Sequence, residues 1–161
     1  MQRLFFFLLF FPFLVSCGYK IGFVNAKFLE NKKTFCVVSV QNPTTNLRLS
    51  SLIKTSLRDE LVKRVGIKEI SCDKADLWFY VKVLNYSDIT KVESEKETTL
   101  KSELNINVDV KVVDRKEKKE VWSISGLSCE ESYLSSSKKN AEIQLIRDLV
   151  EKIVDKMSVE F

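Results

Sequence analysis

The chain offers few side chains that could perform catalysis. Its 161 residues include no histidine, which excludes Ser-His and Cys-His nucleophiles and zinc sites that require an imidazole. Glu130 and Glu131 are adjacent, so their side chains diverge and solvated surface is the favoured interpretation. The serines and lysines of 135–139 precede an expected helix and are better explained as its N-terminal cap. Because the glycines at positions 18, 22, 66 and 126 form no phosphate-binding loop, we expect no enzyme activity, no cofactor and no metal site.

The start of the chain has the layout of a cleaved secretory signal. Arg3 gives a short basic beginning, and residues 4–15 contain no polar side chain. A helix of that length reaches about 18 Å, whereas the hydrocarbon core of a bilayer is roughly 30 Å thick, so it is too short to span one. The alternative, a buried N-terminal helix or strand, would need burial on all sides and would be interrupted by Pro12. Residues 1–16 are therefore predicted to be a signal peptide.

The residues that end this leader could be a lipidation site. Leu14-Val15-Ser16-Cys17 resembles the bacterial lipobox, in which cleavage between Ser16 and Cys17 would leave an N-terminal, acylated cysteine. Each buried methylene of an acyl chain such as palmitate contributes about 0.8 kcal/mol, and two or more chains make a stable anchor. Gly18, rather than aspartate, follows the cysteine, which by resemblance to known lipoprotein sorting implies the outer membrane.

Removing residues 1–16 from the 161 leaves 145, enough for one domain with a substantial core. We expect residues 17–29 to form a lipidated tether or edge segment, and residues 30–161 to form a single α+β domain. The net charge of +4 is mild and dispersed, which argues against a nucleic-acid partner. An exported chain could pair two of Cys36, Cys72 and Cys129, but apolar neighbours make Cys36 look like an ordinary core residue, so no disulfide is expected.

Hydrophobic periodicity predicts the elements in the order β-α-β-β-β-α. Apolar residues recur every three or four positions over 47–65, with Gly66 placed to end the helix, and again over 139–157, where the serines at 135–137 offer an N-cap. Strands are predicted at 35–40, 77–86, 104–113 and 121–125. The charged turn at 114–120 would join the last two strands, and 87–102 would be a polar excursion.

These elements predict an α+β fold, a two-layer sandwich with a mixed sheet of about four strands and two helices on one face. The residues of 104–113 alternate strictly between apolar and polar, as in a sheet that is covered on one side. The first helical crossover should place its two strands parallel.

Basic residues cluster at the predicted hairpin turn. Arg115, Lys116, Lys118 and Lys119 are four cations in five positions, and they could hold phosphate groups of an anionic partner through charge-assisted hydrogen bonds. A solvated hairpin tip is the simpler interpretation. Trp78 and Trp122 are better explained as core or sheet-face residues than as a ligand cage.

Six short motifs, in this order, give the chain a resemblance to the LptE family of lipopolysaccharide-assembly lipoproteins. They are Cys17-Gly18-Tyr19, Asn42-Pro43-Thr44, Leu57-Arg58-Asp59-Glu60-Leu61, Lys74-Ala75-Asp76-Leu77, Val112-Val113-Asp114-Arg115 and Glu120-Val121-Trp122-Ser123. The chain departs from the family in lacking a proline and phenylalanine before Asn42 and a glycine in the hairpin turn, so the resemblance is to a remote member.

The resemblance implies a non-enzymatic lipoprotein that is lipid-anchored in the outer membrane and faces the periplasm or the lumen of a barrel. Its partner would be the β-barrel protein of the lipopolysaccharide translocon, with lipopolysaccharide itself as a ligand, and no contacting residue is carried over from the family. The alternative is a periplasmic adaptor resembling the curli-secretion or penicillin-binding-protein-activator lipoproteins, which would have no lipid ligand.

Overall fold

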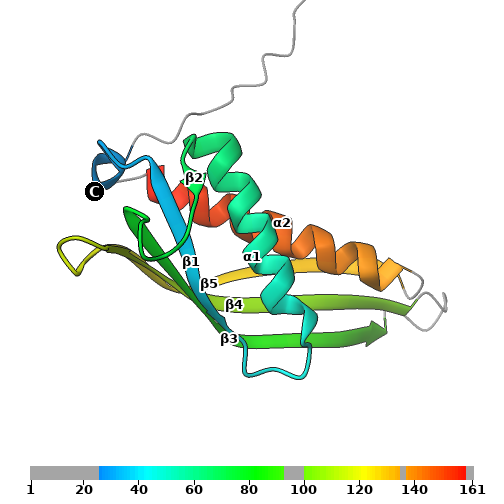
Figure 1. Cartoon of the computed structure of the whole chain (residues 1–161). Helices are drawn as coiled ribbons and strands as arrows, with labels where there is room; N and C mark the ends of the chain where they lie inside the picture. Colours follow the sequence, from blue (N-terminus) through cyan, green and yellow to red (C-terminus); the bar gives the residue numbers. More distant parts are fainter. Residues whose placement is uncertain (1–25, 93–99, 135–136, 159–161) are drawn as a thin grey trace, which may run out of the picture.

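The computed structural model describes residues 26–92, 100–134 and 137–158, which form two layers (Figure 1). The leader, Cys17 and most of the predicted tether lie outside these residues. The sheet has the strand order β2-β1-β3-β4-β5, in which β1 is parallel to both β2 and β3 and the other pairs are antiparallel. The strands are β1 (Thr34–Gln41), β2 (Lys68–Glu69), β3 (Leu77–Val92), β4 (Leu100–Asp114) and β5 (Lys119–Leu134).

The two long helices cover one face of this sheet. Helix α1 (Arg48–Glu60) packs against β1 and α2, and α2 (Lys138–Ser158) packs against β4 and β5. Every second residue of β4 from Leu104 to Val112 is buried beneath them, as the alternating sequence requires; these residues are Leu104, Ile106, Val108, Val110 and Val112. The predicted α+β fold and the parallel crossover are therefore confirmed, and the predicted order of elements holds except that the sheet has a fifth strand, β2, between α1 and β3.

Helix α1 ends close to the predicted position. It continues into a short π-helix, η2 (Leu61–Val65), and the Gly66 N–H donates to the Leu61 carbonyl at 3.0 Å. Gly66 has φ = 77°, a left-handed conformation that glycine adopts without the steric cost of a Cβ atom. The chain can then turn back to form β2, the short edge strand that periodicity could not reveal.

The predicted polar excursion at 87–102 is wrong for most of its length. Both β3 and β4 continue through it, paired from Ser87–Asn105 to Val92–Leu100, and only 93–99 lie outside the described residues. Polar residues are compatible with strands here because their side chains interact between β3 and β4. For example, the hydroxyls of Thr90 and Ser102 are 3.3 Å apart.

Strand β5 is also much longer than the predicted 121–125. Gly126 interrupts its alternation with φ = 67°, and its N–H donates to Asp109 Oδ1 at 2.9 Å. The pairing of β4 with β5 shifts register at this point, as at a β-bulge. Alternation therefore restarts after Gly126, so the second half of the strand is out of phase with the first.

The expectation of unpaired cysteines is wrong. Cys36 and Cys72 form a disulfide, with Cα atoms 5.1 Å apart, and Cys129 is free. Apolar neighbours did identify Cys36 as buried, with 5% exposure, but burial does not exclude a bond. The loop after β2 brings Cys72 beside β1, and this proximity follows from an element that the sequence pattern does not show.

Candidate functional site

Two aspartates organise the end of the sheet where β3 begins and β4 ends. Asp76 Oδ2 accepts the Thr34 hydroxyl at 2.7 Å and the backbone N–H groups of Lys33 and Thr34 at 3.1 and 3.2 Å. The hydrogen bond from the Thr34 hydroxyl is the main reason that the pKa of Asp76 lies below its usual value. Asp76 therefore fixes the start of β1 against the start of β3.

The second carboxylate, Asp114, holds the β4–β5 turn. It is only 2% exposed, and its Oδ1 accepts the N–H groups of Lys116 and Glu117 at 2.8 and 3.1 Å. Its Oδ2 pairs with Lys32, and this hydrogen-bonded ion pair is the main cause that holds the pKa of Asp114 below its usual value. Asp114 is a capping residue of the turn.

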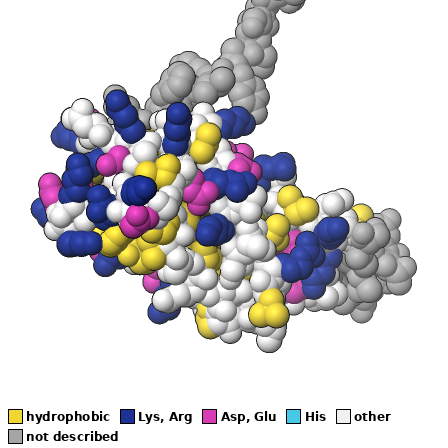
Figure 2. Space-filling view, viewed as in Figure 1, with side chains coloured by type: hydrophobic (Ala, Val, Ile, Leu, Met, Phe, Trp, Pro, Cys, Tyr) yellow, Lys and Arg dark blue, Asp and Glu magenta, His cyan; other side chains and the backbone are white. Residues whose placement is uncertain are grey.

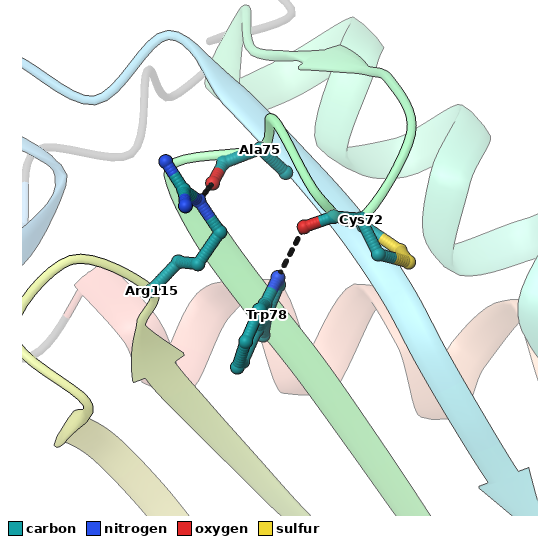
Figure 3. The surroundings of a disulfide bond; sticks show 5 residues. Cys72, Ala75, Trp78 and Arg115 are labelled. Atoms are coloured by element: carbon teal, nitrogen blue, oxygen red, sulfur yellow. Dashed lines mark hydrogen bonds between the residues drawn. A yellow bond between two sulfur atoms is a disulfide. The ribbon is translucent and has the colours of Figure 1, made fainter.

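The structure separates the four predicted cations of the turn into two kinds. The Arg115 Nε–H donates to the Ala75 carbonyl at 2.7 Å (Figure 3), and the Arg115 backbone N–H donates to the Asp76 carbonyl at 3.0 Å. Arg115 thus ties the turn to the preceding loop. Lys116, Lys118 and Lys119 are exposed, and Figure 2 shows Lys and Arg side chains gathered around this end of the molecule.

Lys118 connects the turn to an aromatic side chain. It adopts φ = 57°, the left-handed position that a glycine occupies in many hairpins, and its Nζ lies 4.0 Å from the centroid of the Trp78 ring. This is cation–π geometry. The indole N–H of Trp78 donates to the Cys72 carbonyl at 2.7 Å (Figure 3).

The two tryptophans lie on different sides of the sheet. Trp78, Tyr80 and Lys82 alternate along β3 with the buried core residues Phe79 and Val81, and Lys111 is the β4 partner of Tyr80. These four side chains therefore lie on the face opposite α1 and α2, which we call the open face. Trp122 packs against the buried core on the helix side and stacks on Phe28, with ring centroids 6.5 Å apart. Phe28 belongs to a short 3-10 helix, η1 (Lys27–Leu29), so this stacking holds the first described residues close to the basic turn.

Polar residues at the other end of the sheet have structural roles. Glu142, 5% exposed, accepts Asn46 Nδ2 at 2.5 Å and the Tyr86 hydroxyl at 2.9 Å. Asn42 Nδ2 in turn donates to the Asn46 carbonyl at 2.7 Å. This network joins the loop before α1 to α2 and β3, and burial raises the pKa of Tyr86 well above its usual value.

The other sequence candidates form no reactive cluster. Glu130 pairs with Asn105 and Glu131 with Leu104, so the two carboxylates lie on opposite faces of the sheet. The Ser137 hydroxyl donates to the Leu134 carbonyl at 2.8 Å, and the capping role predicted for Ser135 and Ser136 lies outside the described residues. Within 26–92, 100–134 and 137–158, no three potential metal ligands come together, and no helix is long and apolar enough to cross a membrane.

Comparison with known proteins identifies the family. Residues 32–158 match the family described as "LptE: Lipopolysaccharide-assembly". The chain belongs to the LptE family. The match begins at Lys32, the partner of Asp114, and ends with α2, so it covers the whole two-layer domain. No curated protein sequence matches this chain.

Solved structures share the LptE-like fold at low sequence identity. PelC from Paraburkholderia phytofirmans, described as a dodecamer, is 17% identical with a TM-score of 0.52, and the alignment covers 74% of this chain and 86% of PelC. A putative lipoprotein from Caulobacter crescentus is 17% identical with a TM-score of 0.51, covering 74% and 87%. Lipoprotein GNA1162 from Neisseria meningitidis is 15% identical with a TM-score of 0.50, covering 78% and 98%.

The geometry explains three of the LptE-like motifs in physical terms. Asn42 Oδ1 accepts the backbone N–H and the hydroxyl of Thr44 at 3.1 and 2.6 Å, which forms the turn before α1. Asp76 and the Asp114-Arg115 pair meet at one end of the sheet and fix how β1, β3 and the hairpin join. These motif residues are therefore parts of the scaffold, and their roles as described need no ligand.

Proposed function

We propose that this protein is a lipid-anchored outer-membrane lipoprotein that acts without catalysis in lipopolysaccharide assembly by binding a β-barrel partner. The observation that carries the proposal is the family match over residues 32–158. The predicted lipobox at Leu14–Cys17 supports anchoring through Cys17. The domain would face the periplasm or occupy the lumen of the barrel.

The position of the first described residue supports a membrane-proximal basic turn. Ala26 lies nine residues after Cys17, so at about 3.3–3.6 Å per residue the connecting chain can reach at most roughly 30 Å. The Phe28–Trp122 stacking and the Lys32–Asp114 ion pair hold this start of the domain at the end that carries Lys116 and Lys119. Anchoring at Cys17 would therefore bring these lysines near anionic headgroups.

Purification of the full chain with its membrane partners tests the barrel proposal. A C-terminally tagged chain, extracted from its own membranes in mild detergent, should retain one large outer-membrane β-barrel protein. Isolation as a ring of identical subunits without a barrel, or with a peptidoglycan synthase, would overturn the proposal in favour of an adaptor role.

Acylation is tested separately by metabolic labelling. The wild-type chain should incorporate labelled palmitate, and a Cys17→Ala chain should not. Cys129→Ala provides a matched control because it removes a different unpaired cysteine and should leave labelling intact. Incorporation of palmitate into the Cys17→Ala chain would contradict the proposed anchor.

The basic turn is proposed to contact phosphate groups of lipopolysaccharide. Of the four predicted residues, Lys116 and Lys119 are the ones to reverse, because Arg115 holds the Ala75 loop and Lys118 lies over Trp78. Lys116→Glu with Lys119→Glu should weaken lipopolysaccharide binding in a salt-dependent manner. Unchanged binding by this double variant would remove the turn from the proposal.

A further inference from the structure

The open face of the sheet carries a continuous surface of aromatic and cationic side chains. Trp78, Tyr80 and Lys82 are alternate residues of β3, so they point to the same side, and their β4 partners are Val113, Lys111 and Asp109. The β1 partners of Tyr80 and Lys82 are Ser39 and Gln41. Two aromatic rings, two lysines and two neutral polar side chains thus share one patch.

Two shallow hollows follow this patch. One, of about 380 Å³, is lined by Trp78, Tyr80, Lys111, Val113 and Lys118. The second, of about 210 Å³, adjoins it and is lined mainly by Ser39, Gln41, Tyr80, Lys82, Asp109 and Lys111. Both hollows are lined by Tyr80 and Lys111, so they adjoin, and we call them together the groove.

The aromatic end of the groove is held in place before any ligand arrives. The Trp78 indole N–H bonds to the Cys72 carbonyl, and Cys72 is linked by its disulfide to Cys36 on β1, the strand beside β3 (Figure 3). Lys118 lies over the same ring. A ring with a fixed orientation loses little conformational freedom on binding.

The charge of the groove favours an anion. Its cations, Lys82, Lys111 and Lys118, outnumber by one the two nearby carboxylates, Asp109 and Glu120. Asp109 accepts the Gly126 N–H, and Glu120 accepts the Ser123 hydroxyl at 2.6 Å and pairs with Lys111 at 3.3 Å. The ammonium group of a lysine binds phosphate as a compact positive charge, so these lysines suit a phosphorylated ligand.

The position of the groove in the sheet argues against a peptide that adds as a strand. Where the groove lies, strands β3 and β4 are internal: β3 pairs with β1 and β4 from Leu77 to Lys82, and β4 pairs with β3 and β5. Strand addition requires an exposed sheet edge, so a ligand over this groove must be bound by side chains. Aromatic faces, amide and hydroxyl groups and lysines together match the apolar faces, hydroxyls and phosphates of a phosphorylated sugar.

We propose that the open face binds the phosphorylated saccharide portion of lipopolysaccharide, with Trp78 and Tyr80 against sugar rings and Lys82 and Lys111 on phosphate. This inference rests on the proposed function for the identity of the ligand, and it adds a second contact surface to Lys116 and Lys119 of the basic turn, which adjoins the groove at Lys118. The barrel partner is not needed for it, so the two proposals can fail separately.

The emission of Trp78 gives a local readout of binding. The chain has two tryptophans, so Trp122→Phe leaves Trp78 as the only one. We expect titration of this variant, in non-ionic detergent, with lipopolysaccharide that lacks O-antigen to shift Trp78 emission in a saturable way. Phosphatase-treated lipopolysaccharide should bind about tenfold or more weakly, since charge-assisted hydrogen bonds are lost.

Charge reversal locates the site. Lys82→Glu with Lys111→Glu, in the same background, should weaken binding about tenfold or more, whereas Lys54→Glu with Lys63→Glu places the same charge change on exposed helical residues and should change binding less than about twofold. Equal binding by the two double variants, or binding that leaves Trp78 emission unchanged, would overturn the proposal. Equally tight binding of an acidic peptide would overturn the assignment to a saccharide.

Discussion

At the scale of single residues, carboxylates organise the basic end of the molecule. Asp76 and Asp114 each accept hydrogen bonds from two backbone N–H groups, and Arg115 donates to a backbone carbonyl of the loop that carries Asp76. Asp76, Asp114 and Arg115 resemble a charged ligand-binding cluster, but their hydrogen bonds are made within the protein and stabilise the fold. The exposed lysines around them are the ones available to a partner.

Replacement of Arg115 distinguishes a structural cation from the solvent-exposed ones. Arg115→Ala should lower the free energy of unfolding by about 1–2 kcal/mol, because the Ala75 carbonyl loses a charged donor. Lys116→Ala, a neighbouring exposed cation, should change it by less than about 0.5 kcal/mol. Urea denaturation followed by circular dichroism measures both, and equal effects would contradict the assigned role of Arg115.

The depressed pKa values predict how stability depends on pH. The pKa of Asp114 is lowered mainly by Lys32, and that of Asp88 mainly by Lys138, which lies 2.6 Å from Asp88 Oδ2. A carboxyl group whose pKa is lower in the folded state binds protons more readily when unfolded. It therefore stabilises the fold above its unfolded pKa of about 3.9, and this contribution is lost as the pH falls below that value.

Asp114→Asn tests this pH dependence at one residue. Asparagine can still accept the N–H groups of Lys116 and Glu117, but it neither titrates nor pairs ionically with Lys32. The variant should be less stable than wild type at pH 7, and the difference should shrink as the pH is lowered towards 3. Urea midpoints measured across this range report it, and a constant difference would refute the contribution of the ion pair.

At the scale of the elements, the loop after β2 shows no pattern in the sequence, yet several long-range contacts hold it in place. Its Cys72 forms the disulfide to β1 and accepts the Trp78 indole N–H, and its Ala75 accepts Arg115. The loop therefore positions both the aromatic end of the open face and the base of the basic turn.

Removal of the disulfide should change both stability and the environment of Trp78. Cys36→Ser with Cys72→Ser should lower the free energy of unfolding by about 4 kcal/mol, as expected for a bond between residues 36 positions apart in the chain. In the Trp122→Phe background, the folded variant should also show more solvent-exposed Trp78 emission. Cys129→Ser should leave that emission unchanged, and identical emission from all three chains would show that the disulfide does not position Trp78.

The sequence predicted helices and strands well where their hydrophobic periodicity is strong. It predicted them poorly where contacts with distant residues determine how far a strand extends. The apolar stripe of α1, the alternation of apolar and polar residues in β4 and the position of Gly66 at the end of η2 can all be recognised in the sequence. The extension of β3 and β4 past Ser87 does not, because its polar side chains resemble a loop until cross-strand partners such as Thr90 and Ser102 are known. For the same reason the position of Trp78 under Lys118 depends on contacts across β3, β4 and the turn.

At the scale of the whole molecule, one end of the domain combines the first described residues, the basic turn and the aromatic end of the open face. The stacking of Phe28 on Trp122 and the ion pair of Lys32 with Asp114 establish this arrangement. In the proposed function, an anchor at Cys17 orients this end towards the membrane. The helices α1 and α2 cover the face of the sheet opposite the open face.

Site-specific crosslinking in intact cells tests the central claim, that the domain acts against a β-barrel partner, most directly. A photoreactive residue is placed at exposed Lys119 in the turn, and the same residue at exposed Lys54 on α1 samples a second surface. We predict that at least one position yields, on irradiation, an adduct with a large outer-membrane barrel protein, and that Cys17→Ala diminishes it. Adducts only between two copies of this chain, at both positions, would contradict the account.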